Sequence, residues 1–165
     1  MIGLDARISG RMRIADRPGL LRSIAAILAH SGDSWFWLVG LGLLWWQGTD
    51  YWKIRAAILI IAILLTALLV FLVKFTVRRR RPAGEWGKLY RTTDPHSFPS
   101  GHAVRAAMLA VIMVELGPLW FGLLLTAWAP LVGLARVAMG VHFLSDVVFG
   151  WILGLIVGGL VLLIV

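Results

Sequence analysis

Residues 54–73 read IRAAILIIAILLTALLVFLV and contain one charged residue, Arg55. This run matches the roughly 20 apolar residues that a helix needs to cross the hydrocarbon core of a bilayer. Residues 143–165 form a second such run, in which Asp146 is the only charge. Hydrophobic residues make up 60% of the chain, whereas soluble domains contain roughly 45–50%. The sequence therefore predicts an integral, multi-pass membrane protein.

Apolar runs and turn residues divide the whole chain into helices. Residues 1–18 are polar and basic, and residues 18–30 have the apolar spacing of an amphipathic helix at the membrane surface. Five spans are expected after this helix, so the predicted fold is an all-α helical bundle. The first is short, but tryptophans at both of its ends favour a crossing. The approximate spans are 35–46, 54–73, 100–116, 119–135 and 142–165.

The net charge of +8 allows two interpretations. Nucleic-acid-binding proteins are often basic, but the sequence has no RNA- or DNA-binding motif. Lys and Arg also flank membrane spans, where anionic headgroups attract them. We therefore expect a membrane and no nucleic acid as partner. The chain has no cysteine, which excludes disulfides and thiolate chemistry.

Successive spans run in opposite directions, and this alternation brings distant polar residues together. The second span ends at Lys74, the third begins at Ser100, the fourth ends at Arg136 and the fifth begins at His142. All four positions are expected on the same side of the membrane. The sequence thus predicts one polar cluster at one end of the bundle.

The first polar motif of this cluster is Lys74 followed by Arg81-Pro82. Lysine is common at the end of a span, so Lys74 alone is weak evidence for a site. Pro82 distinguishes Arg81 because it fixes where the backbone turns. We interpret the preceding residues, Arg78–Arg80, as an anchor at the membrane surface, with binding of a second phosphate or a sugar-phosphate headgroup as the alternative.

The second motif is residues 99–102, Pro-Ser-Gly-His. Ser100 suits the N-cap of the third span, and Gly101 allows a ligand to approach the backbone closely. The amides of a helix N-terminus bind anions, and His102 follows on the first turn. A capped helix with a surface histidine is the alternative.

The third motif contains His142 and Asp146, four residues apart and therefore expected on one helix face. An aspartate can bind one ring nitrogen of a histidine and leave the other free to attack. An acid within an apolar span needs a partner and is a candidate functional residue. A purely structural pair is the alternative.

These groups together suit a phosphate. Cations and helix amides stabilise oxygens that gain charge in the transition state, one histidine attacks phosphorus, and the other protonates the departing oxygen. A metal site is the weaker alternative, because acids are few and the excess positive charge opposes a cation.

In order and spacing, the three motifs resemble those of the type 2 phosphatidic acid phosphatase (PAP2) superfamily, which shares its core with vanadium haloperoxidases and bacterial acid phosphatases. That family has K-x6-RP, then PSGH, then SR-x5-H-x3-D. Ala135 stands where the family usually has Ser, a departure that we expect to be minor. The matching residues are Lys74 with Arg81-Pro82, then 99–102, then Arg136, His142 and Asp146.

The resemblance implies a PAP2-like bundle and hydrolysis through a phosphohistidine. His142 would be the nucleophile, oriented by Asp146, and His102 would be the general acid. No metal or other cofactor is implied. Asp94 and His96 match no motif position, and we interpret them as loop structure, with a headgroup contact as the alternative. The implied phosphate-binding residues are Lys74, Arg81, Ser100, Gly101 and Arg136.

A single transmembrane domain is expected over residues 1–165, with 1–31 as a basic N-terminal segment and interfacial helix and 74–146 holding the catalytic motifs. The expected substrate is a lipid phosphate: phosphatidate, phosphatidylglycerol phosphate or a polyprenyl-linked phosphate. One alternative is an undecaprenyl diphosphate phosphatase in carrier-lipid recycling. Another is a non-catalytic lipid-phosphate-binding membrane protein, although that would not need the two histidines.

Orientation and assembly are less constrained by the sequence. Of 16 Lys and Arg, only Lys53 and Arg55 lie on the side away from the site, which favours a site in the cytoplasm of a cell-membrane protein. Many bacterial members of the family face outward. The spacings Gly150-x3-Gly154 and Gly154-x3-Gly158 are typical of close helix contacts, within one chain or in a homo-oligomer.

Overall fold

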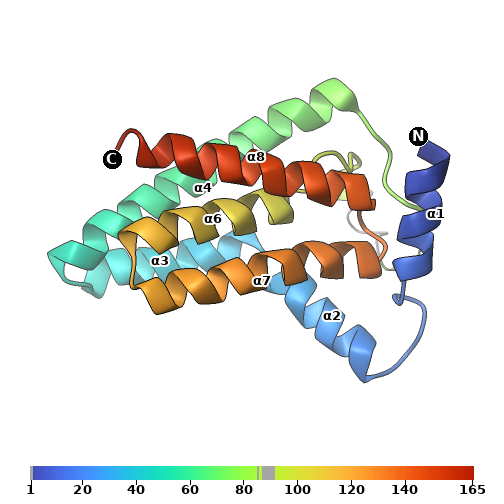
Figure 1. Ribbon diagram of the computed structural model, residues 1–165, viewed down its shortest axis with the longest axis horizontal. Coiled ribbons are helices and arrows are strands. Elements are labelled where there is room, and N and C mark those ends of the chain that lie inside the picture. Colours follow the sequence, from blue (N-terminus) through green and yellow to red (C-terminus); the bar gives the residue numbers. More distant parts are fainter. Residues whose placement is uncertain (1, 85, 87–91) are drawn as a thin grey trace.

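The computed structural model describes residues 2–84, 86 and 92–165. The long helices α3, α4, α6, α7 and α8 form a bundle, while α1 and α2 lie at one end of it (Figure 1). No strand is present within the described ranges, so the all-helical fold predicted from the sequence is confirmed. The seven helices formed by these residues are α1 (Ile2–Met12), α2 (Leu20–Ser31), α3 (Ser34–Gln47), α4 (Asp50–Val77), α6 (Gly101–Leu116), α7 (Leu119–Ala138) and α8 (Leu144–Leu162).

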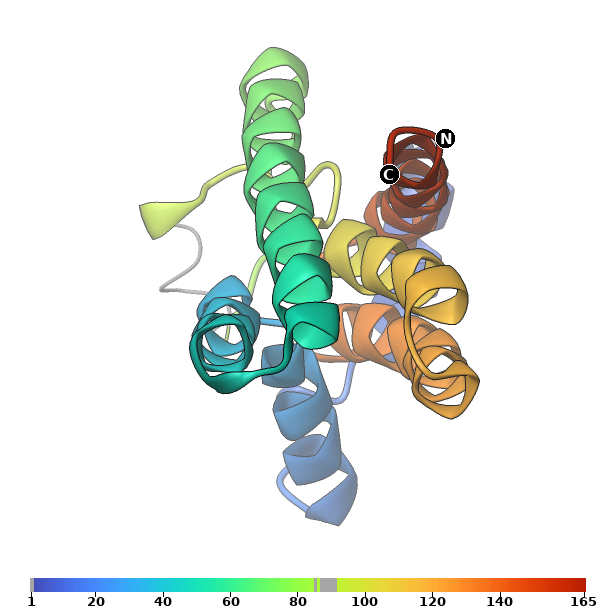
Figure 2. The ribbon, with the colours of Figure 1, turned by 90° about the vertical axis from the view of Figure 1, so that its left-hand side faces the viewer.

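Helix α6 is the core of the bundle. Figure 2 shows α6 packed among α4, α7 and α8. Its side chains Met108, Leu109 and Ile112 are fully buried, as expected for a helix that is apolar around most of its circumference. The buried helix carries His102 in its first turn and thereby fixes the position of that residue.

Three glycines of α8 allow close packing against α6. A Cβ atom at Gly150 would lie 2.9 Å from the Cβ of Ala103, and one at Gly158 would lie 2.8 Å from the Cβ of Val111. Gly154, one turn from each, is equally crowded by α6. The two Gly-x3-Gly spacings are therefore used for a helix contact within one chain.

Helices α4, α7 and α8 are long and apolar enough to cross a bilayer. Helices α2 and α3 meet at an angle of 55° and would provide a fourth crossing if the bent pair is one span. The chain is thus a multi-pass membrane protein. The five predicted spans all appear as helices, but α3 has 14 residues and α6 has 16, which is fewer than a straight crossing usually needs.

The N-terminal segment differs from the sequence expectation because residues 2–12 form a helix. Helix α1 packs against the start of α8: the backbone N–H of Leu144 donates to Ser9 Oγ at 2.9 Å, and that of Ser145 donates to Asp5 Oδ1 at 3.2 Å. The first amides of a helix lack partners within the helix. Helix α1 therefore accepts hydrogen bonds from the first backbone N–H groups of α8, beside the third sequence motif.

Candidate active site

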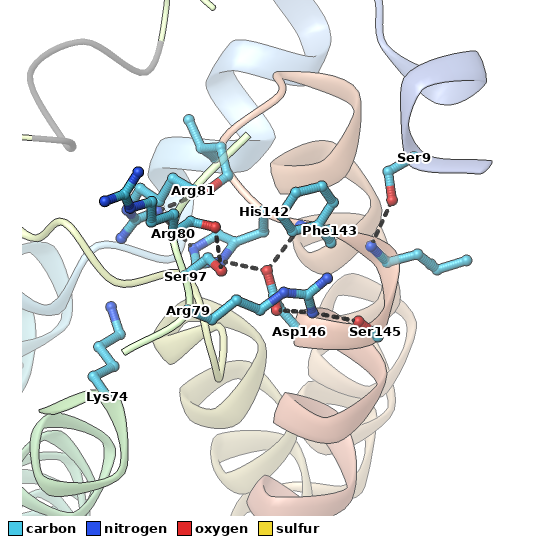
Figure 3. Close-up of polar contacts among 12 residues, drawn as sticks. Ser9, Lys74, Arg79, Arg80, Arg81, Ser97, His142, Phe143, Ser145 and Asp146 are labelled. Carbon is cyan, nitrogen blue, oxygen red and sulfur yellow. Dashed lines mark hydrogen bonds and ion pairs between the residues drawn. The ribbon is translucent and has the colours of Figure 1, made fainter. Parts of the chain in front are cut away.

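The ends of four helices converge on one cavity, as the alternation of the spans predicts. Lys74 lies in the last turns of α4, His102 in the first turn of α6, and Arg136 near the end of α7. His142 lies in the turn before α8. All four line a cavity of about 580 Å³, and Arg81 and Gly101 line it as well. Figure 3 shows the part of this region around His142 and Asp146.

His142 presents a lone pair toward the cations of the cavity. Its side chain is 1% exposed, and Arg81 Nη1 lies 3.1 Å from its Nε2 atom. Because a guanidinium can only donate, Nε2 accepts this hydrogen bond and is unprotonated. Burial, together with the positive charges of Arg81, Arg136 and Lys74, lowers the pKa of His142 well below its usual value. The imidazole is therefore held neutral, as a nucleophile requires.

Asp146 is completely buried beside the other ring nitrogen of His142. The distance from Asp146 Oδ2 to His142 Nδ1 is 3.6 Å, beyond the range of a hydrogen bond, although catalytic contacts are often long without substrate. Oδ2 accepts the N–H of Phe143 at 2.8 Å, and Ser97 also donates to the carboxylate (Figure 3). The expected shared helix face is wrong: α8 begins at Leu144, so His142 precedes the helix.

Arg79 corrects a second expectation. Residues 78–80 were interpreted as a membrane anchor or a headgroup contact, but Arg79 Nη1 donates to Asp146 Oδ1 at 2.7 Å (Figure 3). Its Nη2 donates to Asp5 Oδ2 at 2.6 Å, and its guanidinium lies over the ring of Phe143. Arg78 and Arg80 have exposed side chains, in agreement with the anchor interpretation. Arg79 and Asp5 are thus site residues that the sequence analysis missed.

Asp94 bridges two of the cations. Its Oδ2 atom accepts hydrogen bonds from Lys74 Nζ and, at 2.7 Å, from Arg81 Nη2. The backbone carbonyl of Asp94 also accepts from Arg81 Nε at 2.6 Å. The sequence analysis favoured a loop role for this residue. In the structure its carboxylate lies where an anion held by Lys74 and Arg81 would lie.

The start of α6 lacks the side-chain cap that its motif predicts, and the amide of its N-cap residue is not free to bind an anion. Ser100 is at the N-cap position, but its side chain makes no capping hydrogen bond, which corrects the expected capping role. Its backbone N–H donates to the carbonyl of Asp146 at 3.0 Å. That amide is therefore committed to joining α6 to α8. Gly101 lines the cavity and keeps the backbone accessible there.

His102 has a partner that no motif indicated. Its Nε2 atom lies 2.6 Å from Oδ1 of Asp33, at the junction of α2 and α3. Arg105, one turn further along α6, donates to the carbonyl of Gly32 at 2.9 Å. The contact between His102 and Asp33 joins residues 69 positions apart, so no local spacing in the sequence predicts it.

The described part of the chain holds no cluster of three or more His, Asp or Glu side chains arranged to bind a metal ion. The cavity is instead lined by two histidines among Lys and Arg side chains, and its two carboxylates are already bound, Asp33 to His102 and Asp94 to Lys74 and Arg81. Such a set suits an anion with several oxygens, such as a phosphate.

Two curated relatives are similar to this chain in sequence. Decaprenylphosphoryl-5-phosphoribose phosphatase of Mycobacterium tuberculosis is 32% identical over 153 residues, which cover 90% of this chain and 82% of that protein. Undecaprenyl-diphosphatase of Sulfolobus acidocaldarius is 34% identical over 100 residues, 58% of this chain. The matched part spans 48% of that archaeal protein.

Two solved structures share the fold. The transmembrane PAP2-type phosphatidylglycerolphosphate phosphatase of Bacillus subtilis superposes with a TM-score of 0.75 and 27% identity, covering 98% of this chain and 84% of its own. LpxE of Aquifex aeolicus gives a TM-score of 0.74 and 28% identity, covering 94% and 93%. The sequence profile of the PAP2 superfamily matches residues 55–165. With this match and the arrangement of its motif residues around one cavity, the chain belongs to the PAP2 superfamily.

Proposed function

We propose that this membrane protein is a lipid phosphate phosphatase that works through a phosphohistidine on His142. The observation that carries the proposal is the hydrogen bond from Arg81 to His142 Nε2. Because Arg81 donates this bond, Nε2 carries a lone pair and no proton on the side of the ring that faces the cations, and the lone pair becomes free to attack when Arg81 turns to a phosphate oxygen. A buried neutral imidazole aimed into a cationic pocket is suited to attack phosphorus.

The reaction has two steps. In the first, the lone pair of His142 Nε2 forms a bond to phosphorus, and the bond from phosphorus to the lipid oxygen breaks with its electron pair on oxygen. His102 gives that oxygen a proton. In the second step, neutral His102 takes a proton from water as the water oxygen forms a bond to phosphorus, and the bond from phosphorus to His142 Nε2 breaks with its electron pair on nitrogen. Free phosphate leaves, and both histidines return to their starting states.

The cations and acids have separate roles in this scheme. Lys74, Arg81 and Arg136 line the cavity with Gly101 and would bind the phosphate oxygens. Ser100, the N-cap residue of α6, precedes Gly101 and is proposed to bind phosphate on the strength of the family motif alone. Asp146 would stabilise the positive charge that His142 gains when it attacks. In this scheme the reaction proceeds without a metal ion or other cofactor.

The cavity walls support a lipid substrate. Trp35 of α3 and Val70, Phe71 and Phe75 of α4 line it beside the cations. Phe71 and Phe75 also have exposed side chains, in contact at 4.4 Å between ring centroids. A phosphate can therefore lie among the cations while an attached apolar chain leaves along α4 toward the bilayer.

Among lipid phosphates we propose a polyprenyl-linked sugar phosphate as the preferred substrate. The relative from Mycobacterium tuberculosis, which aligns with 90% of this chain, is named as a phosphatase for decaprenylphosphoryl-5-phosphoribose, a polyprenyl-linked sugar phosphate. Phosphatidate, phosphatidylglycerol phosphate and undecaprenyl diphosphate are the competing substrates. The last is favoured by the name of the archaeal relative, which aligns over a shorter segment.

The whole chain is proposed to act as one domain, with the site on the cytoplasmic side of the cell membrane. The profile match begins at residue 55, but α1 and the α2–α3 junction supply Asp5 and Asp33 to the site. The basic residues on the site's side support the orientation. Val165 lies at the opposite end of α8 (Figure 1). A reporter fused there should be extracytoplasmic, and a cytoplasmic reporter would contradict the orientation.

The testing experiment measures phosphate release by the purified protein in detergent with EDTA. The panel contains a polyprenyl-linked sugar phosphate, phosphatidate, phosphatidylglycerol phosphate and undecaprenyl diphosphate, each also given to His142→Ala. Release that survives EDTA and disappears in the variant is expected. Inhibition by EDTA would contradict the metal-free mechanism. Binding without release from any lipid would favour a non-catalytic lipid-phosphate-binding protein.

A further inference from the structure

Both histidines of the site have a carboxylate partner. Asp146 accompanies His142, as the family motif implies, and Asp33 accompanies His102 with 2.6 Å between Oδ1 and Nε2. Asp33 lies outside the segment that matches the family profile. Its other oxygen, Oδ2, lies 3.1 Å from His30 Nδ1. The carboxylate is thus held between an inner and an outer histidine.

The position of Asp33 relative to His102 is fixed by further contacts between α6 and the α2–α3 junction. Arg105 donates to the carbonyl of Gly32 and to the hydroxyl of Ser34, the residues on either side of Asp33. Arg105 is buried although it is charged. Burial of a guanidinium is tolerated when its N–H groups are hydrogen-bonded. Here the bonds of Arg105 attach the α2–α3 junction to α6, the helix that carries His102.

The same contacts define which edge of the imidazole faces Asp33. A Cβ atom built on Gly32 would lie 3.1 Å from His102 Cδ2, the carbon next to Nε2. The Cδ2–Nε2 edge therefore lies against the junction. With Nε2 bound to Asp33, Nδ1 is the ring nitrogen that remains to give a proton to substrate.

The charges around His102 explain why such a partner is needed. A general acid must carry a proton that it can donate, so His102 has to be positively charged before the first step. Arg105 and Arg136 repel that charge, and Lys74, Arg81 and His142 line the same cavity. Asp94 is bound to Lys74 and Arg81. Asp33 is the carboxylate in direct contact with His102.

We propose that Asp33 is a positioning residue for His102: it orients the ring through Nε2 and stabilises the imidazolium whose Nδ1 proton goes to the departing lipid oxygen. This inference rests on the proposed phosphohistidine function. The proton stays on His102 until the bond from phosphorus to oxygen breaks, and Asp33 remains ionised throughout.

The proposal predicts a dependence on the leaving group. A lipid or sugar alkoxide is strongly basic and leaves only with a proton, so its departure needs His102. p-Nitrophenolate leaves without one. Loss of Asp33 should therefore slow the first step with a lipid phosphomonoester and spare the first step with p-nitrophenyl phosphate, whereas loss of the nucleophile slows both. The second step uses His102 as a base with either substrate, so the comparison is made on the first turnover.

The experiment compares full-length wild type and Asp33→Asn on these two substrates in detergent. For the lipid phosphomonoester preferred by wild type, we expect the first-turnover rate of lipid alcohol release to fall about 10- to 100-fold, part of the 10²–10⁴-fold effect of a general acid. For p-nitrophenyl phosphate, the first-turnover rate of p-nitrophenolate release should change by less than about 3-fold, because the general acid's contribution is absent from that step. Asp33→Glu, which keeps a carboxylate, should recover part of the lost rate.

Asp50→Asn is the matched control, because Asp50 is exposed at the opposite end of α4. If Asp33→Asn does not fold, His30→Gln serves instead, since His30 is half-exposed and touches the same carboxylate. It should show a smaller loss with the same dependence on the leaving group. Equal losses on both substrates, or no loss on either, would overturn the inference. If wild type releases phosphate from neither substrate, the result would instead contradict the proposed function itself.

Discussion

Arg79 Nη1 lies 2.7 Å from Asp146 Oδ1, and Nη2 of the same guanidinium lies 2.6 Å from Asp5 Oδ2. One side chain thus joins the acid beside the nucleophile to the N-terminal helix. Asp5 is held in turn by Ser145. Burial of Asp5 opposes its ionisation, but the hydrogen bonds from Ser145 and Arg79 outweigh it, and the pKa of Asp5 is lowered. A charged network of Arg79 and Asp5 therefore fixes the Asp146 carboxylate through Oδ1, the oxygen that does not face His142.

The first prediction concerns Arg79→Gln. Without the guanidinium, Asp146 loses its contact with Arg79 and can turn away from His142. We expect kcat for the preferred lipid phosphate to fall about 10-fold or more, the order found for groups that orient a catalytic side chain from outside, while KM changes little. Steady-state kinetics on purified protein measures both constants.

Arg80→Gln is the control for this prediction, because Arg80 is the next residue and its side chain is exposed. It should leave both constants within about 2-fold of wild type, as surface substitutions usually have small effects. Similar losses in the two variants would show that the arginine run acts through the membrane surface and not through Asp146.

The second prediction concerns the titration of His142. Its pKa is lowered by burial and then by the charges of Arg81, Arg136 and Lys74. A lowered pKa means that the ring stays neutral at pH values below about 6.5, where a free histidine would be protonated, and gains its proton only at still lower pH. Lys74→Met removes one positive charge and should raise this pKa toward the usual value. NMR titration of ¹⁵N-labelled histidine, assigned with His142→Ala, measures the shift.

The third prediction uses the contact of Asp94 with Lys74 and Arg81. A bound phosphate competes with this carboxylate for the same cations. Asp94→Asn removes the competing charge and should lower the inhibition constant of orthovanadate about 3- to 5-fold, a modest effect because partly exposed ion pairs contribute about 1 kcal/mol or less. Weaker inhibition would mean that Asp94 instead holds the cations in place for the anion.

The motif residues could be located from the sequence because their positions follow from simple rules. Apolar runs of about 20 residues define spans, alternating spans place every second end on one side, and Lys74, His102 and His142 lie at such ends. The roles of these residues came from the family resemblance and stay predictions. The bounds were less accurate: α8 begins two residues after His142, because Phe143 and Asp146 together cap it.

The supporting residues could not be found in this way. Asp33 and Asp5 reach their partners across 69 and 74 positions of the chain, and neither belongs to a local pattern. Helix α1 was missed because residues 1–18 lack a long apolar face, and its contacts with α8 are mainly polar. Arg79 was indistinguishable in the sequence from its arginine neighbours. Contacts of this kind depend on how helices dock, which composition and periodicity do not encode.

The last prediction concerns Gly32, which has an ordinary backbone φ of −87°. Alanine would therefore not strain the backbone, but its Cβ would lie 2.9 Å from Val132 Cγ1 and 3.1 Å from His102 Cδ2. Gly32→Ala should lower both the thermal midpoint and kcat for the lipid phosphate, because the new methyl group pushes on the core of α7 and on the imidazole. Adding Val132→Ala makes room on the first side only. The double variant should have a thermal midpoint close to that of Val132→Ala alone, because the clash with residue 132 is gone. Its kcat should stay low, since the contact with His102 persists. Full recovery of kcat would show that the ring position does not depend on this junction, and a double-mutant cycle on both readouts distinguishes the two results.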